Sequence, residues 1–196
     1  ITKNVANPVI SHDGSFAILR ISGDDGNPDL YISRFENQQW TIPTPLQQNI
    51  NTAKDEYYPE ITKDNHLYYS SSGDVYEADY KESIWQNPRS VQELNTSFSE
   101  SNIAISRSGN FLVFLSNRTG NYGSYDLYMS KKTDGKWGQA INLGPKINTN
   151  AMEYQPRFSL DDKYLYFTRS VFTEGKRQGK EYVMRVNLEK VLKELK

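Results

Sequence analysis

Short apolar stretches alternate with turn-forming residues along the whole chain. Within the stretches, large apolar and aromatic residues are frequent and positions of opposite polarity alternate, as in residues 66–69 and 164–167. This two-residue period is typical of half-buried β-strands. Pairs of residues drawn from Asp, Asn, Ser and Gly follow four of these apolar stretches and favour tight hairpins. The pairs lie at residues 13–14, 64–65, 108–109 and 161–162. The pattern therefore predicts antiparallel strands joined by short turns.

The strand pattern occurs four times. Equivalent positions are Pro8, Pro59, Ile103 and Pro156, which gives repeats at about residues 5–58, 59–102, 103–155 and 156–188. An Asp lies 11 residues before a Trp in the first three copies, at residues 29–40, 74–85 and 126–137. In contrast, the interval from the equivalent position to that Asp, or to Glu181 in the fourth copy, is 21, 15, 23 and 25 residues. Constant strand spacing with one variable hairpin indicates a repeated structural module.

Each copy predicts a four-stranded antiparallel meander, and such sheets commonly stack as the blades of a β-propeller. We therefore expect an all-β fold in which residues 1–196 form a single β-propeller domain. The fourth copy has no Trp segment, so it should lack its outer strand. Residues 187–196 should form a short C-terminal helix, because their apolar positions have helical spacing. Its stripe either docks on the propeller rim or binds a partner; the stripe consists of Leu188, Val191, Leu192 and Leu195.

The N-terminal segment ITKNVANP is similar to INTNAMEYQP at residues 147–156, which precedes the fourth copy. The chain thus starts just after the position of a fourth strand. We expect a fragment of a longer propeller of five or six blades. The alternatives are a self-closed ring of four blades and a ring completed by an additional segment or by another chain.

Composition excludes several classes of protein. The 196 residues include 23 Lys and Arg, 24 Asp and Glu, and no Cys. The net charge of −1 offers no general attraction to nucleic acid or anionic lipid, so neither is an expected partner. Without Cys there is no disulfide framework, thiolate nucleophile or zinc-thiolate site. No run of 18 apolar residues predicts a membrane span. The 14 Tyr, 8 Phe and 3 Trp fit a protein made of strands.

Three motifs carry a resemblance to a known family: P-x-I-S-x-D-G, the S-N-R-x-G-x-Y-G-x-x-D-L-Y run at residues 116–128, and W-x-x-x-x-N-L-G-x-x-I-N-T at residues 137–149. They resemble TolB-like, WD40-like β-propeller repeats, over nearly the whole chain. The resemblance implies a periplasmic or secreted protein of the bacterial envelope. The best known family member binds a peptidoglycan-associated lipoprotein in the periplasm. Propellers also host enzymes, so function transfers poorly with this fold.

The repeated acids and tryptophans have structural explanations. A carboxylate at a fixed place in every repeat is expected to cap a turn, which applies to Asp29, Asp74 and Asp126. Trp40, Trp85 and Trp137 are expected to pack between adjacent sheets. Residues 24–29 are rich in oxygen ligands, but they lack the spacing of a dedicated calcium loop. We expect a solvated hairpin tip and no cofactor; the alternative is a calcium site at Asp24, Asp25 and Asp29.

No catalytic motif is present, whether a nucleophile elbow, a phosphate-binding loop or a zinc-protease signature. We therefore name no catalytic residue. A carbohydrate-acting enzyme would need two converging carboxylates, for which Glu56, Glu60, Glu153 and Asp161 are formal candidates without a distinguishing spacing. Whether the chain is an enzyme is open at this point, with a non-enzymatic role favoured.

The segments that precede the second and fourth repeats combine tyrosines with acids, in DEYYP at residues 55–59 and MEYQP at residues 152–156. In propellers this connection passes near the mouth of the central channel. We expect a binding face there, formed by Glu56, Tyr57, Tyr58, Glu153 and Tyr154, with packing between blades as the alternative. The favoured function is a non-enzymatic module that recognises a protein or polysaccharide partner through these loops. The alternative is a propeller enzyme acting on carbohydrate, or the propeller domain of a larger enzyme.

Overall fold

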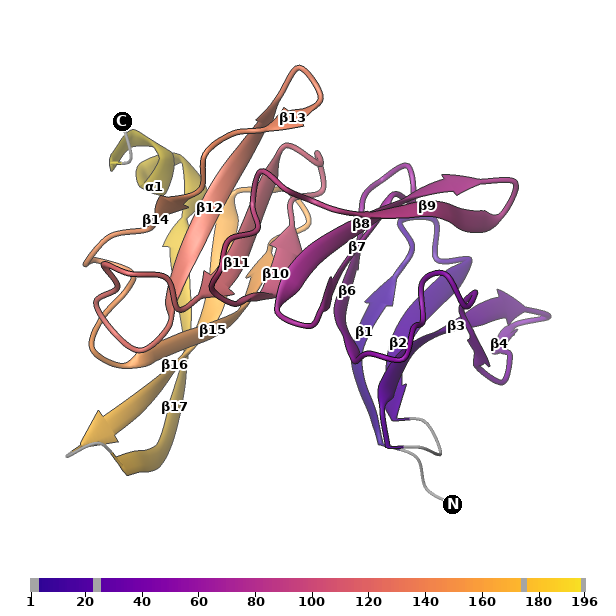
Figure 1. The fold of residues 1–196 in the computed structure, drawn as a ribbon, viewed down its shortest axis with the longest axis horizontal. Coiled ribbons are helices and arrows are strands. Elements are labelled where there is room, and N and C mark those ends of the chain that lie inside the picture. The colour runs from indigo at the N-terminus through magenta and orange to yellow at the C-terminus, as the bar shows by residue number, and fades with distance from the viewer. Residues whose placement is uncertain (1–3, 23–25, 174–175, 195–196) are drawn as a thin grey trace. The chain divides into compact units, whose positions relative to one another are not determined.

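The computed structural model describes residues 4–22, 26–173 and 176–194. The chain consists of two compact units, a first that ends at Val91 and a second that begins at Gln92. Each unit contains two antiparallel sheets, and the strands of each sheet follow one another along the chain (Figure 1). The prediction of an all-β fold of antiparallel propeller blades is confirmed. No helix in the described ranges is long and apolar enough to cross a membrane.

The first unit contains sheets 1 and 2. Sheet 1 has the order β1-β2-β3-β4, with β5 also paired to β3; its strands are β1 (Val5–Ile10), β2 (Phe16–Ser22), β3 (Pro28–Glu36), β4 (Gln39–Trp40) and β5 (Thr44–Pro45). Sheet 2 has the order β6-β7-β8-β9; its strands are β6 (Glu56–Ile61), β7 (Leu67–Ser71), β8 (Asp74–Lys81) and β9 (Ile84–Ser90). Apart from β5, each strand pairs with its neighbour in sequence, as expected for a meander.

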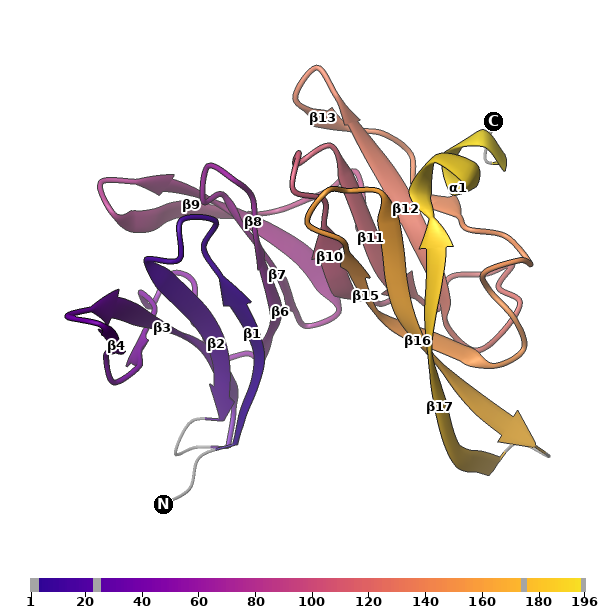
Figure 2. The ribbon, with the colours of Figure 1, turned by 180° about the vertical axis from the view of Figure 1, so that it is seen from behind.

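The second unit contains sheets 3 and 4 and the helix α1. Sheet 3 repeats the plan of sheet 1, with β10 (Glu100–Ile105), β11 (Phe111–Ser116), β12 (Asp126–Thr133), β13 (Lys136–Trp137) and β14 (Ile141–Asn142). Sheet 4 has only β15 (Met152–Phe158), β16 (Tyr164–Thr173) and β17 (Lys176–Asn187). The predicted lack of an outer strand in the fourth repeat is therefore confirmed. Figure 2 shows the same strands from behind.

The predicted fourth strand is continuous only in sheet 2. In sheets 1 and 3 it is split into two short pieces that pair with different parts of the third strand. Side chains replace the lost ladder at each break: Ser33 Oγ donates to the Thr41 carbonyl (2.6 Å), and Ser130 Oγ donates to the Gly138 carbonyl (2.7 Å). The break thus leaves these backbone carbonyls satisfied although the strand is interrupted.

Apolar side chains fill the space between the sheets of each unit. In the first unit Phe16 meets Trp85 edge-on with ring centroids 5.5 Å apart, which joins sheet 1 to sheet 2. Trp85 is buried as predicted, and its Nε1 donates to the Asn65 carbonyl (2.8 Å). The same prediction is wrong for Trp40, which is 45% exposed and packs on Phe35 of its own sheet. Trp40 is the second residue of the two-residue strand β4, which lies at the edge of sheet 1 and leaves the ring partly open to solvent.

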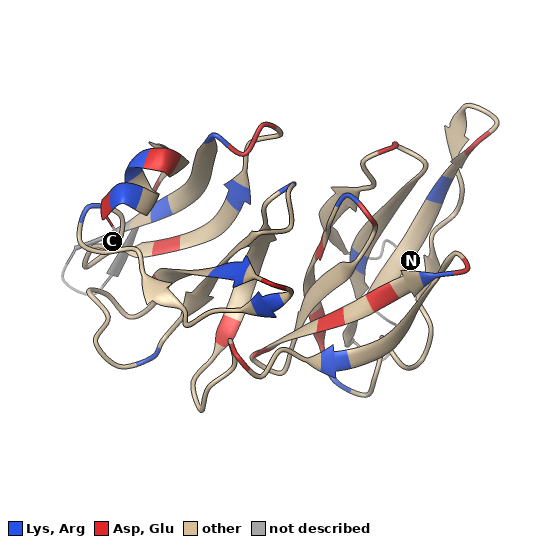
Figure 3. Ribbon diagram, turned by 90° about the horizontal axis from the view of Figure 1, so that it is seen from above, with Lys and Arg blue, Asp and Glu red and all other residues tan. Residues whose placement is uncertain are grey.

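Helix α1 (Leu188–Glu194) follows β17 directly and contributes to the core between sheets 3 and 4. Leu188 and Val191 are buried there, and Leu192 packs against the same cluster. The helix is therefore docked within its unit, in agreement with the first of the two readings of its apolar stripe. Leu195 lies outside the described residues. Acidic and basic residues cover the rest of the helix (Figure 3).

The innermost strand of every sheet carries a β-bulge at the same place. Its register shifts just before the equivalent positions Pro8, Pro59, Ile103 and Pro156. The residue in front of each adopts a positive φ of 47–51°; these residues are Asn7, Tyr58, Asn102 and Gln155. Positive φ is common for Asn but costly for a bulky residue such as Tyr58. The bulge re-aims the side chains at the start of each innermost strand.

Candidate functional site

An Asn-Thr-x-x-x-Glu segment leads into three of the four innermost strands, at residues 51–56, 95–100 and 148–153. The Asn side chain binds the third strand of the preceding sheet. Asn51 accepts from the Leu30 amide and donates to the Leu30 carbonyl, both at 2.9 Å, and Asn148 makes the same pair with Leu127. In these two copies the segment thus ties β6 and β15 to the previous sheet of the same unit through backbone groups.

The Glu of this segment is completely buried in all three copies, as Glu56, Glu100 and Glu153. The preceding Thr binds it twice in each copy. In the second unit the Thr149 hydroxyl donates to Glu153 Oε1 at 2.7 Å and the Thr149 amide to Oε2 at 3.1 Å. Thr52 and Thr96 repeat this arrangement. Such bonds favour the charged carboxylate and offset part of its desolvation.

The three buried carboxylates differ in their counter-charge. Arg118 lies 2.9 Å from Glu100 Oε1, and Arg169 lies 2.7 Å from Glu153 Oε1. Each guanidinium also donates to a backbone carbonyl, of Leu94 and Ile147 respectively. Among the described residues no cation pairs with Glu56, whose remaining partner is the Ser71 hydroxyl (3.1 Å). Burial raises the pKa of Glu56, although the bonds from Thr52 and Ser71 act against that shift.

The residue on the second strand opposite each Glu explains the difference between Glu56 and Glu153. Arg169 of β16 pairs with Glu153, whereas Ser71 of β7 occupies the same register position opposite Glu56. In sheet 3 this position is Ser116, and Arg118 reaches Glu100 from the hairpin just after β11. In sheet 2 a two-residue turn at Ser72 and Gly73 follows Ser71 directly, with φ of 54° and 88°.

Beside Glu56, a group of half-buried side chains lies where β6 begins; we call Arg20, Asp55, Tyr57 and Tyr58 the tyrosine patch. The Tyr57 hydroxyl donates to Asp55 (2.7 Å), and the Arg20 guanidinium lies 5.1 Å from the centre of the Tyr57 ring. The Tyr57 and Tyr58 rings are 5.9 Å apart. Burial, followed by the bond to Asp55, raises the pKa of Tyr57, so its hydroxyl stays protonated at neutral pH.

Arg20 is not fully satisfied within the patch. Its Nε is buried and has no hydrogen-bond partner in the part of the chain that the structure describes. A buried guanidinium nitrogen without an acceptor is costly in a folded protein.

The corresponding place in the second unit is built differently. Tyr154, at the start of β15, donates its hydroxyl to the Glu181 carboxylate of β17. Tyr182 next to it is 51% exposed. Here the Tyr is tied to its own sheet, whereas the tyrosine patch of the first unit joins side chains of both its sheets.

The five residues predicted to form a binding face therefore have two environments. Glu56 and Glu153 are inaccessible and hold backbone and side-chain donors. Tyr57, Tyr58 and Tyr154 are partly exposed. The prediction omitted Glu100, the three Thr residues and the two Arg partners. The threefold Asn-Thr-x-x-x-Glu motif was a usable signal for Glu100 and the Thr residues, whereas the Arg residues occupy no constant position in the repeats.

The metal hypothesis concerned residues 24–29. Asp24 and Asp25 lie outside the described residues. Asp29 is part of β3 and pairs with Ile21. In the described ranges no group of three His, Asp or Glu side chains could hold a metal ion. A calcium site at this hairpin stays an untested prediction.

Four successive antiparallel meanders, with bulged innermost strands and side-chain links from one sheet to the next, define the fold of β-propeller blades. Solved structures agree. Two TolB proteins are similar to this chain. The putative TolB of Agrobacterium tumefaciens has a TM-score of 0.68 and 15% identity over 95% of this chain and 62% of that one. TolB of Acinetobacter baumannii has a TM-score of 0.63 and 12% identity over 95% of this chain and 42% of that one.

An α-L-arabinofuranosidase of Lactobacillus brevis is similar as well, with a TM-score of 0.63 and 13% identity over 93% of this chain and 72% of that one. No protein-family model matches the sequence, and no curated protein matches it significantly. The chain spans 42% and 62% of the lengths of the two TolB proteins. At these identities the likeness establishes the TolB-like β-propeller fold, a fold shared by proteins of different activity.

Proposed function

We propose that this propeller is a non-enzymatic binding module and that the tyrosine patch of the first unit contacts its partner. The observation that carries the proposal is the combination of Arg20, with an unsatisfied buried Nε, and the adjacent rings of Tyr57 and Tyr58. Tyr and Arg are the residues that contribute most to protein–protein binding. The positive φ of Tyr58 is a further sign, because backbone strain concentrates at binding and active sites.

The chemistry of the patch favours a protein partner over a polysaccharide. Asp55 and Arg20 offer one acceptor and one donor beside two rings, which suits a peptide backbone and a polar side chain. A polysaccharide is the second ligand class to test, since sugar rings also stack on tyrosines. The likeness to TolB proteins supports a periplasmic or secreted location, and this location is part of the proposal.

Carbohydrate hydrolysis has no comparable support. Glu56 and Glu153 are buried and bonded to Thr, and Asp161 caps its own hairpin through Ser159, which holds the pKa of Asp161 at about 2. A general acid for glycoside cleavage needs a raised pKa and access to the substrate. None of these three carboxylates combines the two properties.

A photo-crosslinking residue in place of Tyr58 would test the proposal, with the same residue in place of Tyr122 as control. Tyr122 is a surface tyrosine of the second unit, 49% exposed. We expect one discrete protein adduct from periplasmic extract at position 58, absent at position 122 and lost when Arg20→Gln is added. Equal labelling at both positions would contradict the proposal. Retention of a polysaccharide by the wild type and not by Tyr57→Ala would assign the patch to sugars instead.

We propose a second contact at the outer edge of sheet 4, where an additional segment or chain completes the sheet. Strand β17 pairs only with β16 among the described residues. Residues 183–185 occupy the place at which β3, β8 and β12 accept a fourth strand, and Val183 is 79% exposed. An open edge of this kind readily adds a strand. A peptide with the sequence of residues 137–143 should slow amide exchange at Val183, whereas a scrambled peptide should not.

A further inference from the structure

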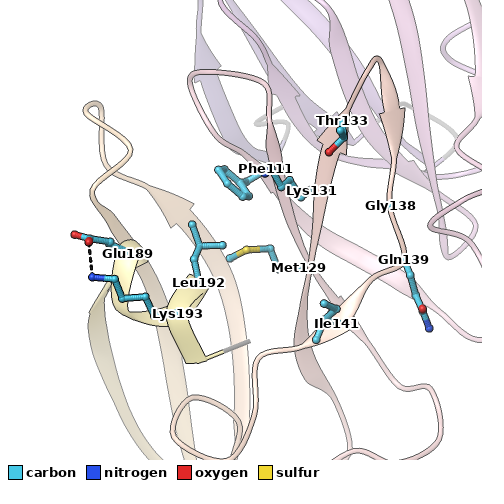
Figure 4. A pocket seen from close by; sticks show the side chains of 10 residues that line it. All are labelled: Phe111, Met129, Lys131, Thr133, Gly138, Gln139, Ile141, Glu189, Leu192 and Lys193. Atoms are coloured by element: carbon cyan, nitrogen blue, oxygen red, sulfur yellow. Dashed lines mark hydrogen bonds and ion pairs between the residues drawn. The ribbon is translucent and has the colours of Figure 1, made fainter. Parts of the chain in front are cut away.

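A pocket of about 560 Å³ lies in the second unit, between α1 and the outer part of sheet 3 (Figure 4). It is separate from the tyrosine patch, which belongs to the first unit. Its volume is within the range of small-molecule sites, roughly 300–1,000 Å³. Residues from four elements, β11, β12, β14 and α1, and from the loop between β13 and β14 line it.

The break in the fourth strand of sheet 3 opens this pocket. Met129, Lys131 and Thr133 alternate along β12 and therefore point to the same face of the sheet. Between β13 and β14 the chain passes through Gly138, whose amide donates to the Lys131 carbonyl (2.9 Å). A Cβ at Gly138 would approach that oxygen to 3.2 Å, so the absence of a side chain keeps this wall close to β12.

Helix α1 covers the break on the other side. Its Leu188 and Val191 are buried in the core of the unit, so the helix is held firmly, and Leu192 faces Met129 across the pocket (Figure 4). Sheet 1 has the same interruption after Trp40, but no helix follows that sheet in the first unit. The pocket is therefore a property of this one repeat and not of the fold in general.

The charges around the pocket are unequal. Glu189 and Lys193 pair with each other on α1 at 2.6 Å, and Lys193 lowers the pKa of Glu189, which keeps that carboxylate ionised. This pair is neutral as a whole. Lys131 has no ion-pair partner within the described ranges, so one positive charge stands at the rim of an apolar floor formed by Phe111, Met129, Ile141 and Leu192.

We propose that this pocket binds a small amphipathic carboxylic acid, with an aliphatic or aromatic body against Met129 and Leu192 and its carboxylate at Lys131. The apolar floor excludes a fully polar ligand, because such a ligand would lose its hydration without new partners. A neutral apolar ligand would leave the Lys131 ammonium uncompensated beside it. A single lysine provides a point charge suited to one carboxylate. The lining contains no Arg, whose guanidinium would form the two parallel hydrogen bonds that favour phosphate.

Decanoate and decanol are suitable probes because they share a chain and differ in charge. Calorimetry on the full chain, below the micellar concentration of decanoate, should show one saturable site. A charged hydrogen bond is worth about 1.5 kcal/mol or more, so decanoate should bind about tenfold more tightly than decanol. Acetate, which has the charge without the chain, should show no saturable binding. Equal affinity for decanoate and decanol, or saturable acetate binding, would overturn the proposal.

Two variants test the assigned residues. Lys131→Gln should reduce decanoate affinity to that of decanol, while Lys136→Gln should leave it unchanged. Lys136 is a matched control because it is exposed on the adjacent β13 and does not line the pocket. Ile141→Trp fills the pocket from its half-exposed rim and should weaken both probes at least about tenfold. Should that variant fail to fold, Thr133→Trp does the same from β12. Unchanged binding in the filled or the Lys131 variant would refute the site.

Discussion

Glu56 in the first unit and Glu153 in the second occupy the same place in their repeats, and both are fully buried. Each accepts one bond from the hydroxyl and one from the amide of the Thr four residues earlier in the chain. They differ in one respect: Arg169 neutralises Glu153, whereas Glu56 has no cationic partner among the described residues. The backbone role of the Asn-Thr-x-x-x-Glu segment is thus the same in both units. The electrostatic solution is not, because the strand position opposite the Glu holds Arg169 in sheet 4 and Ser71 in sheet 2.

The comparison shows how one residue on the neighbouring strand changes the chemistry of a repeated position within a single chain. A buried ion pair is balanced as long as both partners are present, and removing one leaves an uncompensated charge. A buried carboxylate without a cation adjusts by a raised pKa instead. Glu56 is a carboxylate of this second kind. Two residues of the tyrosine patch, Tyr57 and Tyr58, follow it directly in β6.

The largest effect is expected for Arg169→Met. It would leave Glu153 charged, buried and dependent on Thr149 alone, at a cost of about 3 kcal/mol in the free energy of unfolding. Urea denaturation at pH 7 measures this. Arg185→Met is the control, because Arg185 is exposed and packs over the Tyr164 ring at 4.7 Å; it should cost less than about 1 kcal/mol. Similar losses in both variants would mean that the Glu153 pair contributes nothing specific.

The paired substitutions Glu153→Gln and Glu56→Gln test the same difference by changing the carboxylates and leaving Arg169 in place. Glu153→Gln should cost about 2 kcal/mol at pH 7, because Arg169 loses a charged hydrogen bond. Glu56→Gln should be within about 1 kcal/mol of the wild type, because the loss of the weak bond from the Thr52 amide is offset by removal of an uncompensated charge. A larger loss for Glu56→Gln than for Glu153→Gln would reverse our interpretation of the two sites.

The pH dependence of stability should carry a contribution from Glu56. Its pKa is raised in the folded state, so the folded chain binds this proton more tightly than the unfolded chain. The resulting stabilisation is complete below the unfolded value of 4.5 and is lost as the pH rises through the folded pKa. The stability of the wild type relative to Glu56→Gln should therefore fall between pH 4 and pH 7, as measured by urea denaturation at each pH.

Asp13 provides a contrast of opposite sign. Hydrogen bonds from Ser11 and Ser15 lower its pKa to about 2, so its stabilisation is present above 3.8 and disappears as the pH falls towards 2. The stability of the wild type relative to Asp13→Asn should accordingly rise from pH 2 to pH 4. The same slope in both variants would show that the Glu56 signal is not specific to its burial.

The smallest effect is expected for Thr52→Val, at about 1 kcal/mol near pH 7, because one hydroxyl bond to Glu56 is lost. The loss should shrink towards pH 4, where Glu56 is protonated and its bond to a donor is weaker. Thr149→Val is the matched variant, with Arg169 still in place to compensate its carboxylate. Denaturation curves at the two pH values would separate them, and identical behaviour would indicate that the cation does not influence the Thr bond.

Much of the fold was predictable from local pattern. The four repeats, the missing outer strand of the fourth and the C-terminal helix follow from strand periodicity, turn residues and the helical spacing of Leu188 and Val191, whereas the docking of the helix was left open. The split fourth strands were not predicted. The side-chain bonds that replace the ladder there, from Ser33 to the Thr41 carbonyl and from Ser130 to the Gly138 carbonyl, have no sequence signature. For the candidate site, tyrosines beside acids drew notice, but the burial of the acids was not apparent, since a carboxylate is usually exposed.

By itself the sequence determined which residues form strands and hairpins and where each repeat begins, because these depend on short-range periodicity and turn chemistry. Only the tertiary structure decided which side chains meet across sheets. It placed Arg169 on Glu153 and Arg20 on Tyr57, left Glu56 without a cation, and set α1 over a broken strand to form a pocket. These outcomes depend on the register between strands and on packing between distant segments, which no local pattern of residues encodes.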